Sequence, residues 1–198
     1  MTKLKLNIPV YVILFLFFTG CRETPVPKPK GYFRIDLPLK DYVKLDHQKN
    51  IPEMPFTFEY PAYGNLSFGS EAPEEEGWFN IEFPAYRAVI YLTYKPVKND
   101  FASLMEQTYR MNYKNHILKA DAIDVKEFND ESKKVYAVLY DLKGNTATSV
   151  QFYATDSVKH YLRGSLYFNA VPDADSLAPV IRFFREDIVH LVETLSWD

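Results

Sequence analysis

The stretch "KVYAVLYDLKGNTATSVQFYATDSVKHYLRGSLYFN" (residues 134–169) decides the fold. It contains three runs rich in valine, tyrosine, leucine, phenylalanine and threonine, which are mostly residue types that favour β-strands. Between the first two runs, "KGNT" (143–146) supplies Gly144 and Asn145 for a hairpin turn. Because strands joined by short turns pair antiparallel, we expect these runs to form an antiparallel meander.

Strands are also predicted upstream of this stretch, at "PFTFEYP" (55–61), "WFNIEFPAYRAVIYLTYKP" (78–96) and "KADAIDVKEF" (119–128). Pro84 should break the second of these into two strands. The alternating "GYFRIDLP" (31–38) predicts an extended segment that docks on the body, compatible with an edge strand. Residues 39–54 and the glutamate-rich "NLSFGSEAPEEEG" (65–77) are predicted to be irregular.

Two stretches have helical periodicity. "VKNDFASLMEQTYRMNYKNH" (97–116) predicts one helix, and "DADSLAPVIRFFREDIVHLVETLSWD" (173–198) predicts a longer one. The apolar residues of the longer helix fall on one face, which should lie across the sheet: Leu177, Val180, Ile181, Phe184, Ile188, Leu191, Val192 and Leu195.

The order of elements, strands, helix, strands and helix, predicts an α+β protein with an antiparallel β-sheet packed by two main helices. This order is similar to that of the Mog1/PsbP-like sandwich, which is mainly a binding fold. A shared fold does not establish a shared function.

The composition argues against several kinds of site. A net charge of −3 and the absence of a basic stripe give no reason to expect nucleic acid. The single cysteine, Cys21, allows no internal disulfide and no thiolate cluster. His47, His116, His160 and His190 lack the close spacing of a local metal site. We therefore expect no metal or cofactor and no enzymatic activity.

The first residues have the parts of a secretory signal. Lys3 and Lys5 precede an apolar run of 11 residues, from Ile8 to Phe18, whereas a membrane-spanning helix needs about 20. The "FTGC" that follows resembles a bacterial lipobox, in which the cysteine is acylated after cleavage, although Phe18 stands where leucine is usual. Cys21 is therefore predicted to carry the lipid.

Alternating prolines and lysines after Cys21 predict a semi-rigid spacer. The predicted organisation is a removed lipoprotein signal peptide (1–20), a Pro/Lys-rich tether (21–30) and a single α+β domain (31–198).

Three aromatic side chains form a line on the last helix, opposite its apolar face. Phe183, His190 and Trp197 are seven residues apart, so they stack along one side if the helix continues that far. A large aromatic residue on a solvent face suggests a partner surface. The alternative is that residues 31–38 or 39–54 cover this line within the same molecule.

Two short motifs resemble the acidic–hydroxyl–aliphatic acceptor of O-glycosylation in exported Bacteroidota proteins. They contain Ser157, within Asp-Ser-Val, and Ser176, within Asp-Ser-Leu. Three-residue motifs also arise by chance, and Asp-Ser ahead of a helix is a common cap.

Longer strings resemble a known family. "VPKPKGYFRIDLP", "FTFEYP", "GWFNIEFP", "KADAID", "VYAVLYDLKGN" and "HYLRGSLYFNAVPDADSLAPVIRFFREDIVHLVETL" are similar to the gliding motility lipoprotein GldD family of Bacteroidota. The resemblance implies an accessory envelope protein that supports gliding motility and type IX secretion. It brings no active site, and Cys21 alone transfers as a functional position.

The expected partners are envelope motility and secretion proteins, together with the membrane through the lipid. The domain is expected to face the periplasm. Two other functions stay open: a module that binds a lipid or small ligand in a sheet–helix crevice, and a hydrolase whose residues assemble only in space.

Overall fold

The three runs of residues 134–169 form neighbouring strands of one sheet, β8 (Val135–Leu142), β9 (Thr148–Thr155) and β10 (His160–Phe168). This computed structural model describes residues 34–45, 54–68, 77–114 and 118–198. They belong to one compact unit, Arg34–Asp198. The predictions for the signal peptide, Cys21 and the tether lie outside the described residues.

The sheet has seven antiparallel strands in the order β4-β5-β6-β10-β9-β8-β7. The remaining four strands are β4 (Asn65–Phe68), β5 (Trp78–Phe83), β6 (Ala88–Pro96) and β7 (Ile123–Asp130). A short 3-10 turn, η1 (Pro84–Tyr86), separates β5 from β6, as the position of Pro84 predicts.

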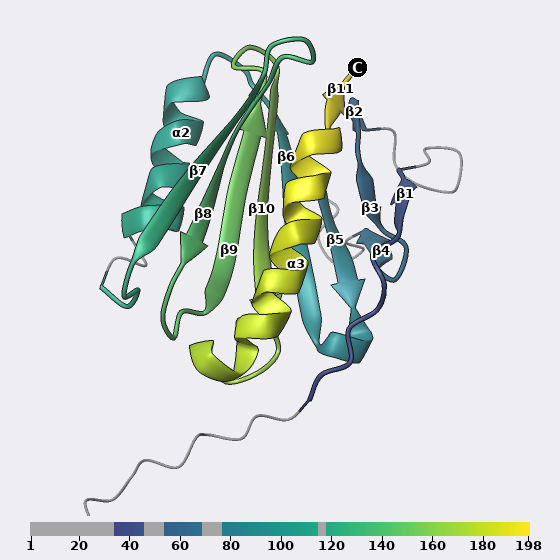
Figure 1. Cartoon of the computed structure of the whole chain (residues 1–198). Coiled ribbons are helices and arrows are strands. Elements are labelled where there is room, and N and C mark those ends of the chain that lie inside the picture. Colours follow the sequence, from purple (N-terminus) through teal and green to yellow (C-terminus); the bar gives the residue numbers. More distant parts are fainter. Residues whose placement is uncertain (1–33, 46–53, 69–76, 115–117) are drawn as a thin grey trace, which may run out of the picture. The chain divides into compact units, whose positions relative to one another are not determined.

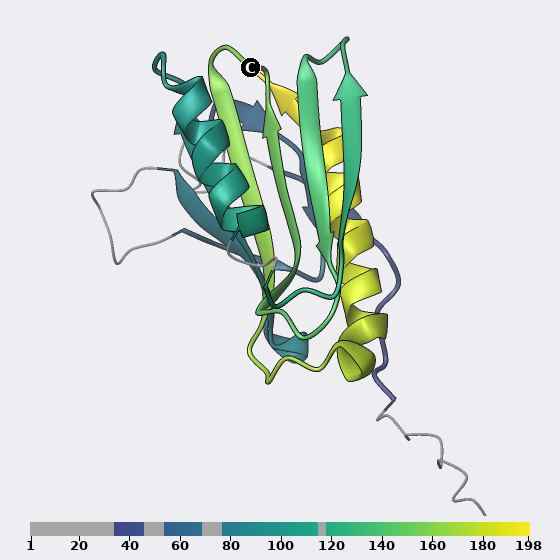
Figure 2. The ribbon, with the colours of Figure 1, turned by 90° about the vertical axis from the view of Figure 1, so that its left-hand side faces the viewer.

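The two helices cover opposite faces of this sheet (Figures 1 and 2). Helix α2 (Phe101–Tyr109), extended by a π-helical turn, η2 (Arg110–Lys114), lies on one face. The longer α3 (Ala174–Thr194) lies on the other. The α+β class with two main helices is therefore confirmed. We call the face that bears α3 the inner face and the opposite one the outer face.

An N-terminal strap, residues 34–45 and 54–63, accompanies α3 on the inner side. It contains β1 (Tyr42–Lys44), β2 (Phe56–Thr57) and β3 (Glu59–Pro61). Strand β1 pairs with β3, and β2 pairs with the C-terminal β11 (Ser196–Trp197). Helix α3 therefore packs against the sheet on one side and against the strap on another.

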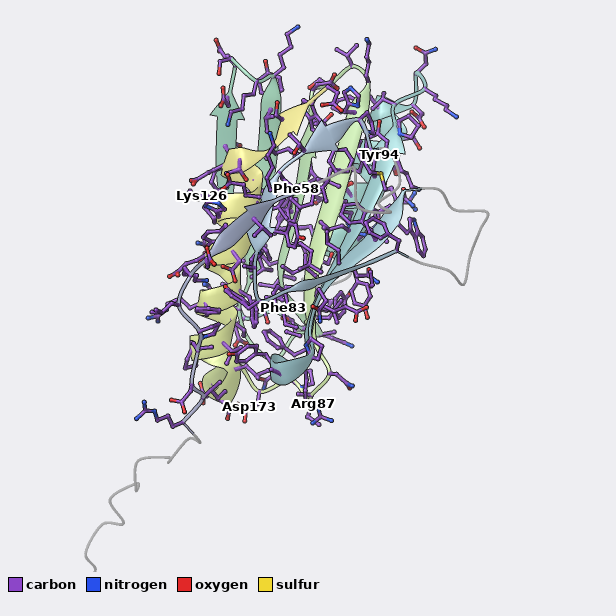
Figure 3. All side chains as sticks on the ribbon, turned by 90° about the vertical axis from the view of Figure 1, so that its right-hand side faces the viewer. Phe58, Phe83, Arg87, Tyr94, Lys126 and Asp173 are labelled. Atoms are coloured by element: carbon purple, nitrogen blue, oxygen red, sulfur yellow. The ribbon has the colours of Figure 1, made fainter. Side chains whose placement is uncertain are left out.

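The core lies between the inner face, α3 and the strap. Alternate residues of each strand point into it, as the period of two requires. Phe58 of the strap and Phe83 of β5 lie among these side chains (Figure 3). The largest buried side chains are Phe56, Phe58, Phe79, Phe83, Phe152, Phe184, Ile81, Ile90, Leu92, Leu139, Leu162 and Leu166.

Three sequence predictions need correction. Residues 39–54, predicted to be irregular, contain β1, and the predicted loop at 65–77 begins with β4. The edge strand considered for 31–38 is not present at the described residues 34–38. Both missed strands are short, and β1 finds its partner within the strap rather than in the large sheet.

A close approach inside the sheet explains one glycine. A Cβ atom placed on Gly164 would lie 2.1 Å from Cε1 of Phe152 on the neighbouring strand β9. The Phe152 ring is fully buried, so it has little room to move.

We expect Gly164→Ala to lower the free energy of unfolding by about 1–3 kcal/mol, because the new methyl group overpacks the core. Urea denaturation measures this. Ser165→Ala on the outer face of the same strand is the control and should change stability less. Equal stabilities of the Gly164 variant and the wild type would contradict this account of the packing.

Candidate functional site

The predicted aromatic line on the last helix is not a free surface. Phe183 is buried, at 9% exposure, and its ring packs against Tyr63 and Phe184. Helix α3 ends at Thr194, so Trp197 lies on β11 instead of continuing the line. The expectation of an exposed line is therefore wrong, because the strap covers this side of the helix.

A buried carboxylate holds the strap on α3. Asp187, at 1% exposure, accepts hydrogen bonds from Lys40 Nζ at 2.6 Å, Tyr42 Oη at 2.9 Å and Tyr63 Oη at 2.7 Å. The Lys40 ammonium also lies 3.4 Å from the ring centroid of Phe183. A buried charge is tolerated only when it is paired and hydrogen-bonded, and this one is. We call this group the Asp187 cluster.

His190 extends the same contact along the helix. Its ring stacks on Tyr42 with centroids 3.7 Å apart, and its Nε2 lies 2.7 Å from Oε2 of Glu59. Burial and the Asp187 carboxylate both raise the pKa values of Tyr42 and Tyr63 above their ordinary range, with burial the larger cause. The group therefore joins the strap to α3.

Trp197 and His160 also have structural partners. Their rings stack with centroids 5.1 Å apart, and Trp197 Nε1 donates to the carbonyl of Lys134 at 3.1 Å. His160 Nδ1 lies 3.0 Å from Tyr94 Oη. These contacts fix the C-terminal strand to the sheet.

The two candidate glycosylation sites differ in their surroundings. Ser157 is exposed in a turn with φ 65°, beside Asp156, whose Oδ1 accepts the backbone N–H groups of residues 158 to 160. Ser176 donates its hydroxyl to Asp173, the residue that caps α3. Modification of either serine stays a prediction.

The exposed aromatic residues gather on the outer face of the sheet. Trp78 of β5 is 50% exposed, and Tyr91 of β6 packs edge-to-face on Tyr167 of β10. Of the thirteen large hydrophobic side chains exposed among the described residues, seven belong to the outer-face strands or to α2 and its π-helical turn. They are Trp78, Tyr91, Tyr109, Met111, Val125, Tyr136 and Tyr167.

Further tyrosines cross this face between strands. The rings of Tyr140 and Tyr153 lie 6.5 Å apart, and those of Tyr153 and Tyr161 lie 6.1 Å apart. Burial raises the pKa of Tyr140 to about 12. Tyr161 is hydrogen-bonded to Thr108 of α2, which joins the helix to this side of the sheet.

None of these outer-face residues was predicted from the sequence to belong to a site. The signal was present in the aromatic residues at alternating positions whose neighbours are also apolar, such as Tyr91 between Ile90 and Leu92. This pattern predicts a strand that is apolar on both faces.

A crevice of about 230 Å³ lies on the inner side, between the first half of α3 and the ends of β8 and β9. Arg185 and Asp141 form an ion pair inside it, at 2.7 Å. This is the kind of sheet–helix crevice that the ligand-binding hypothesis requires. A smaller hollow of about 120 Å³ lies beneath α2 on the outer face, beside Trp78 and Tyr161.

The model of the family described as gliding motility lipoprotein GldD matches residues 22–197. The chain belongs to this family. The resemblance predicted from the sequence strings is thus confirmed, and membership supports a membrane-anchored location in the cell envelope.

Among curated protein sequences, none matches this GldD-family chain. Among solved structures, it is similar to cyanobacterial PsbP (CyanoP) from Synechocystis sp. PCC 6803, known from a solution structure. The identity is 12%, the TM-score is 0.47, and the match covers 86% of this chain and 100% of the other. The fold class follows from the strand order and the two helices.

Neither a metal site nor a membrane-spanning helix is found in the described part of this GldD-family chain. Its described histidine, aspartate and glutamate side chains form no group of three that could hold a metal ion. The described helices are too short or too polar to cross a bilayer.

The Asp187 cluster predicts a measurable contribution to stability. Tyr63→Phe removes one hydrogen bond to a buried carboxylate, so we expect the free energy of unfolding to fall by about 1.5–3 kcal/mol at pH 7. Tyr91→Phe, on the exposed outer face, is the matched control and should have a small effect. Chemical denaturation compares the two variants with the wild type.

The pH dependence gives the same variant a second readout. Because the folded-state pKa of Tyr63 lies above its unfolded value, its contribution is fully present below pH 10 and is lost as the pH rises further. Wild-type stability should therefore fall more steeply above pH 10 than that of Tyr63→Phe. Parallel curves would argue against a buried Tyr63 hydroxyl.

Proposed function

We propose that this chain is a lipid-anchored accessory protein of the cell envelope, which supports gliding motility and the associated type IX secretion machinery through protein–protein contacts. In this proposal Cys21 carries the lipid, residues 21–30 are the tether, and the folded domain faces the periplasm. The partners are envelope motility and secretion proteins, and the chain is not an enzyme.

The exposed aromatic outer face is the observation that carries the protein-contact proposal. Tyrosine, tryptophan and methionine are enriched at protein interfaces, where their large side chains supply most of the binding energy. Monomeric proteins rarely leave a large apolar patch uncovered without a function. Strands of the sheet and α2 both contribute such side chains, so a partner could contact several elements at once.

The inner side is less suited to a partner. Helix α3 already packs against the sheet and the strap, and both Phe183 and His190 contact the strap. The described surface with the greatest supply of exposed aromatic residues is therefore the outer face, and we place the partner contact on it.

The outer face can be tested with the double variant Tyr91→Ser/Tyr167→Ser. These rings contact each other and are partly exposed, so we expect the domain to stay folded while gliding is lost. Colony spreading measures gliding, and circular dichroism monitors the fold. Leu39→Ser/Val171→Ser, which removes exposed apolar residues elsewhere, should glide normally. Normal gliding of the tyrosine variant would contradict the placement.

The lipid anchor can be tested separately with Cys21→Ser. Without the thiol no acyl chain can be attached, so the processed chain should leave the membrane fraction, as measured by fractionation and immunoblotting. If the processed variant stays in the membrane fraction after a high-salt wash, the anchor does not depend on Cys21.

A second candidate function is a module that binds a lipid or small ligand. The crevice between α3 and the sheet favours it, because cationic side chains and an apolar wall meet there. This function does not require the outer face.

A further inference from the structure

We propose that the crevice between α3 and the ends of β8 and β9 is a binding site for a phosphate ester, with Arg185 and Arg182 holding the phosphate group. This deepens the second function proposed above, and it stands or falls separately from the protein contacts of the outer face.

The guanidinium of Arg185 is held in one orientation by Asp141. Its Nε donates to both carboxylate oxygens of Asp141, at 2.7 and 2.9 Å, and Asp141 is itself only 8% exposed. Because Nε makes both bonds, the two terminal amino groups of Arg185 are left for other acceptors. Within the described residues, none accepts a hydrogen bond from them. The guanidinium is thus held in place with donors directed elsewhere.

Two further cations line the same crevice. Arg182 lies one turn earlier on α3, and no described residue accepts a hydrogen bond from its guanidinium. Lys143, at the end of β8, is 3.6 Å from Asp124 and is largely exposed. The described lining therefore holds three cationic side chains, of which Arg185 is paired with Asp141 and Lys143 with Asp124. One net positive charge remains, carried by Arg182, and it complements an anion.

Part of the lining is apolar. Ala174 and Ala178 are small residues one turn apart on α3, and they leave space beside Ile181 and Leu142. The hydroxyl-bearing Ser149 lies at the crevice as well. The start of α3 is fixed to the β8–β9 turn by a hydrogen bond from the Ala174 amide to Asn145 Oδ1 at 2.8 Å. The crevice therefore lies between two connected elements.

The arginines and the apolar lining together favour a phosphate ester as the ligand. Guanidinium groups bind phosphate through several N–H donors at once, and an arginine fixed in advance loses little freedom on binding. The volume of about 230 Å³ is below that of typical pockets for drug-sized molecules, so it suits a phosphate with a short carbon chain or a headgroup. A soluble phosphate ester and the phosphate of an anionic lipid share this chemistry.

The test uses the full-length lipidated chain in phosphatidylcholine nanodiscs and the arginine reagent phenylglyoxal. Mass spectrometry follows the modification rates of Arg182 and Arg185, with Arg110 on the other side of the sheet as the internal control. Butyl phosphate should slow modification of Arg182 and Arg185 several-fold and leave Arg110 unchanged. Inorganic phosphate should protect at concentrations roughly tenfold higher, because it lacks the buried methylene groups.

A variant tests the position of the site. Ala178→Leu fills the crevice without altering charge, so it should abolish protection by butyl phosphate. Nanodiscs that contain phosphatidylglycerol distinguish the sources, since protection without any added ester would identify a lipid headgroup as the ligand. Equal modification rates with and without every probe, or protection that persists in Ala178→Leu, would overturn the proposal.

Discussion

The Asp187 carboxylate, buried in the middle of α3, is the constraint on which the arrangement of the inner side depends. Its negative charge is stable there only because Lys40, Tyr42 and Tyr63 bring donors to it. All three come from the strap, more than 120 residues away in the sequence. The helix and the strap therefore need each other: the helix supplies the acceptor, and the strap supplies both the donors and the cover over Phe183.

Because α3 and the strap together cover the inner face of the sheet, the inner and outer faces have different roles. The inner face is occupied by α3 and the strap, so its hydrophobic side chains serve the core. The outer face is covered only in part by α2, and Trp78, Tyr91 and Tyr167 stay exposed there. At one edge of α3, beside Asp141 and Arg185, the helix does not cover the sheet completely, and a crevice remains there. Both proposed binding sites, the outer face and the crevice beside α3, therefore lie where no other element of the described chain covers the sheet completely.

Much of the fold could be predicted from local patterns. The alternation of residues 134–169 gave the meander, and the apolar stripe of α3 gave the surface that covers the sheet, because both depend on neighbours in sequence. Phe183 could not be placed in this way. Its burial depends on polar and irregular residues of the strap, whose partner Asp187 lies on the same side of the helix. Helical periodicity identifies the one apolar face that packs on the sheet. It cannot predict that the strap covers a second side of the helix.

The candidate sites were predictable to different degrees. Cys21 stands out because it is the only cysteine and follows an apolar run. The pair of Arg185 and Asp141 joins positions 44 residues apart, so only the fold brings them together. The strap also has a mechanical consequence. Tension on the chain ahead of Arg34 meets the contacts of Lys40 and Tyr42 before any strand of the seven-stranded sheet. Under load the contacts of the strap are therefore strained before the strand pairs of the sheet.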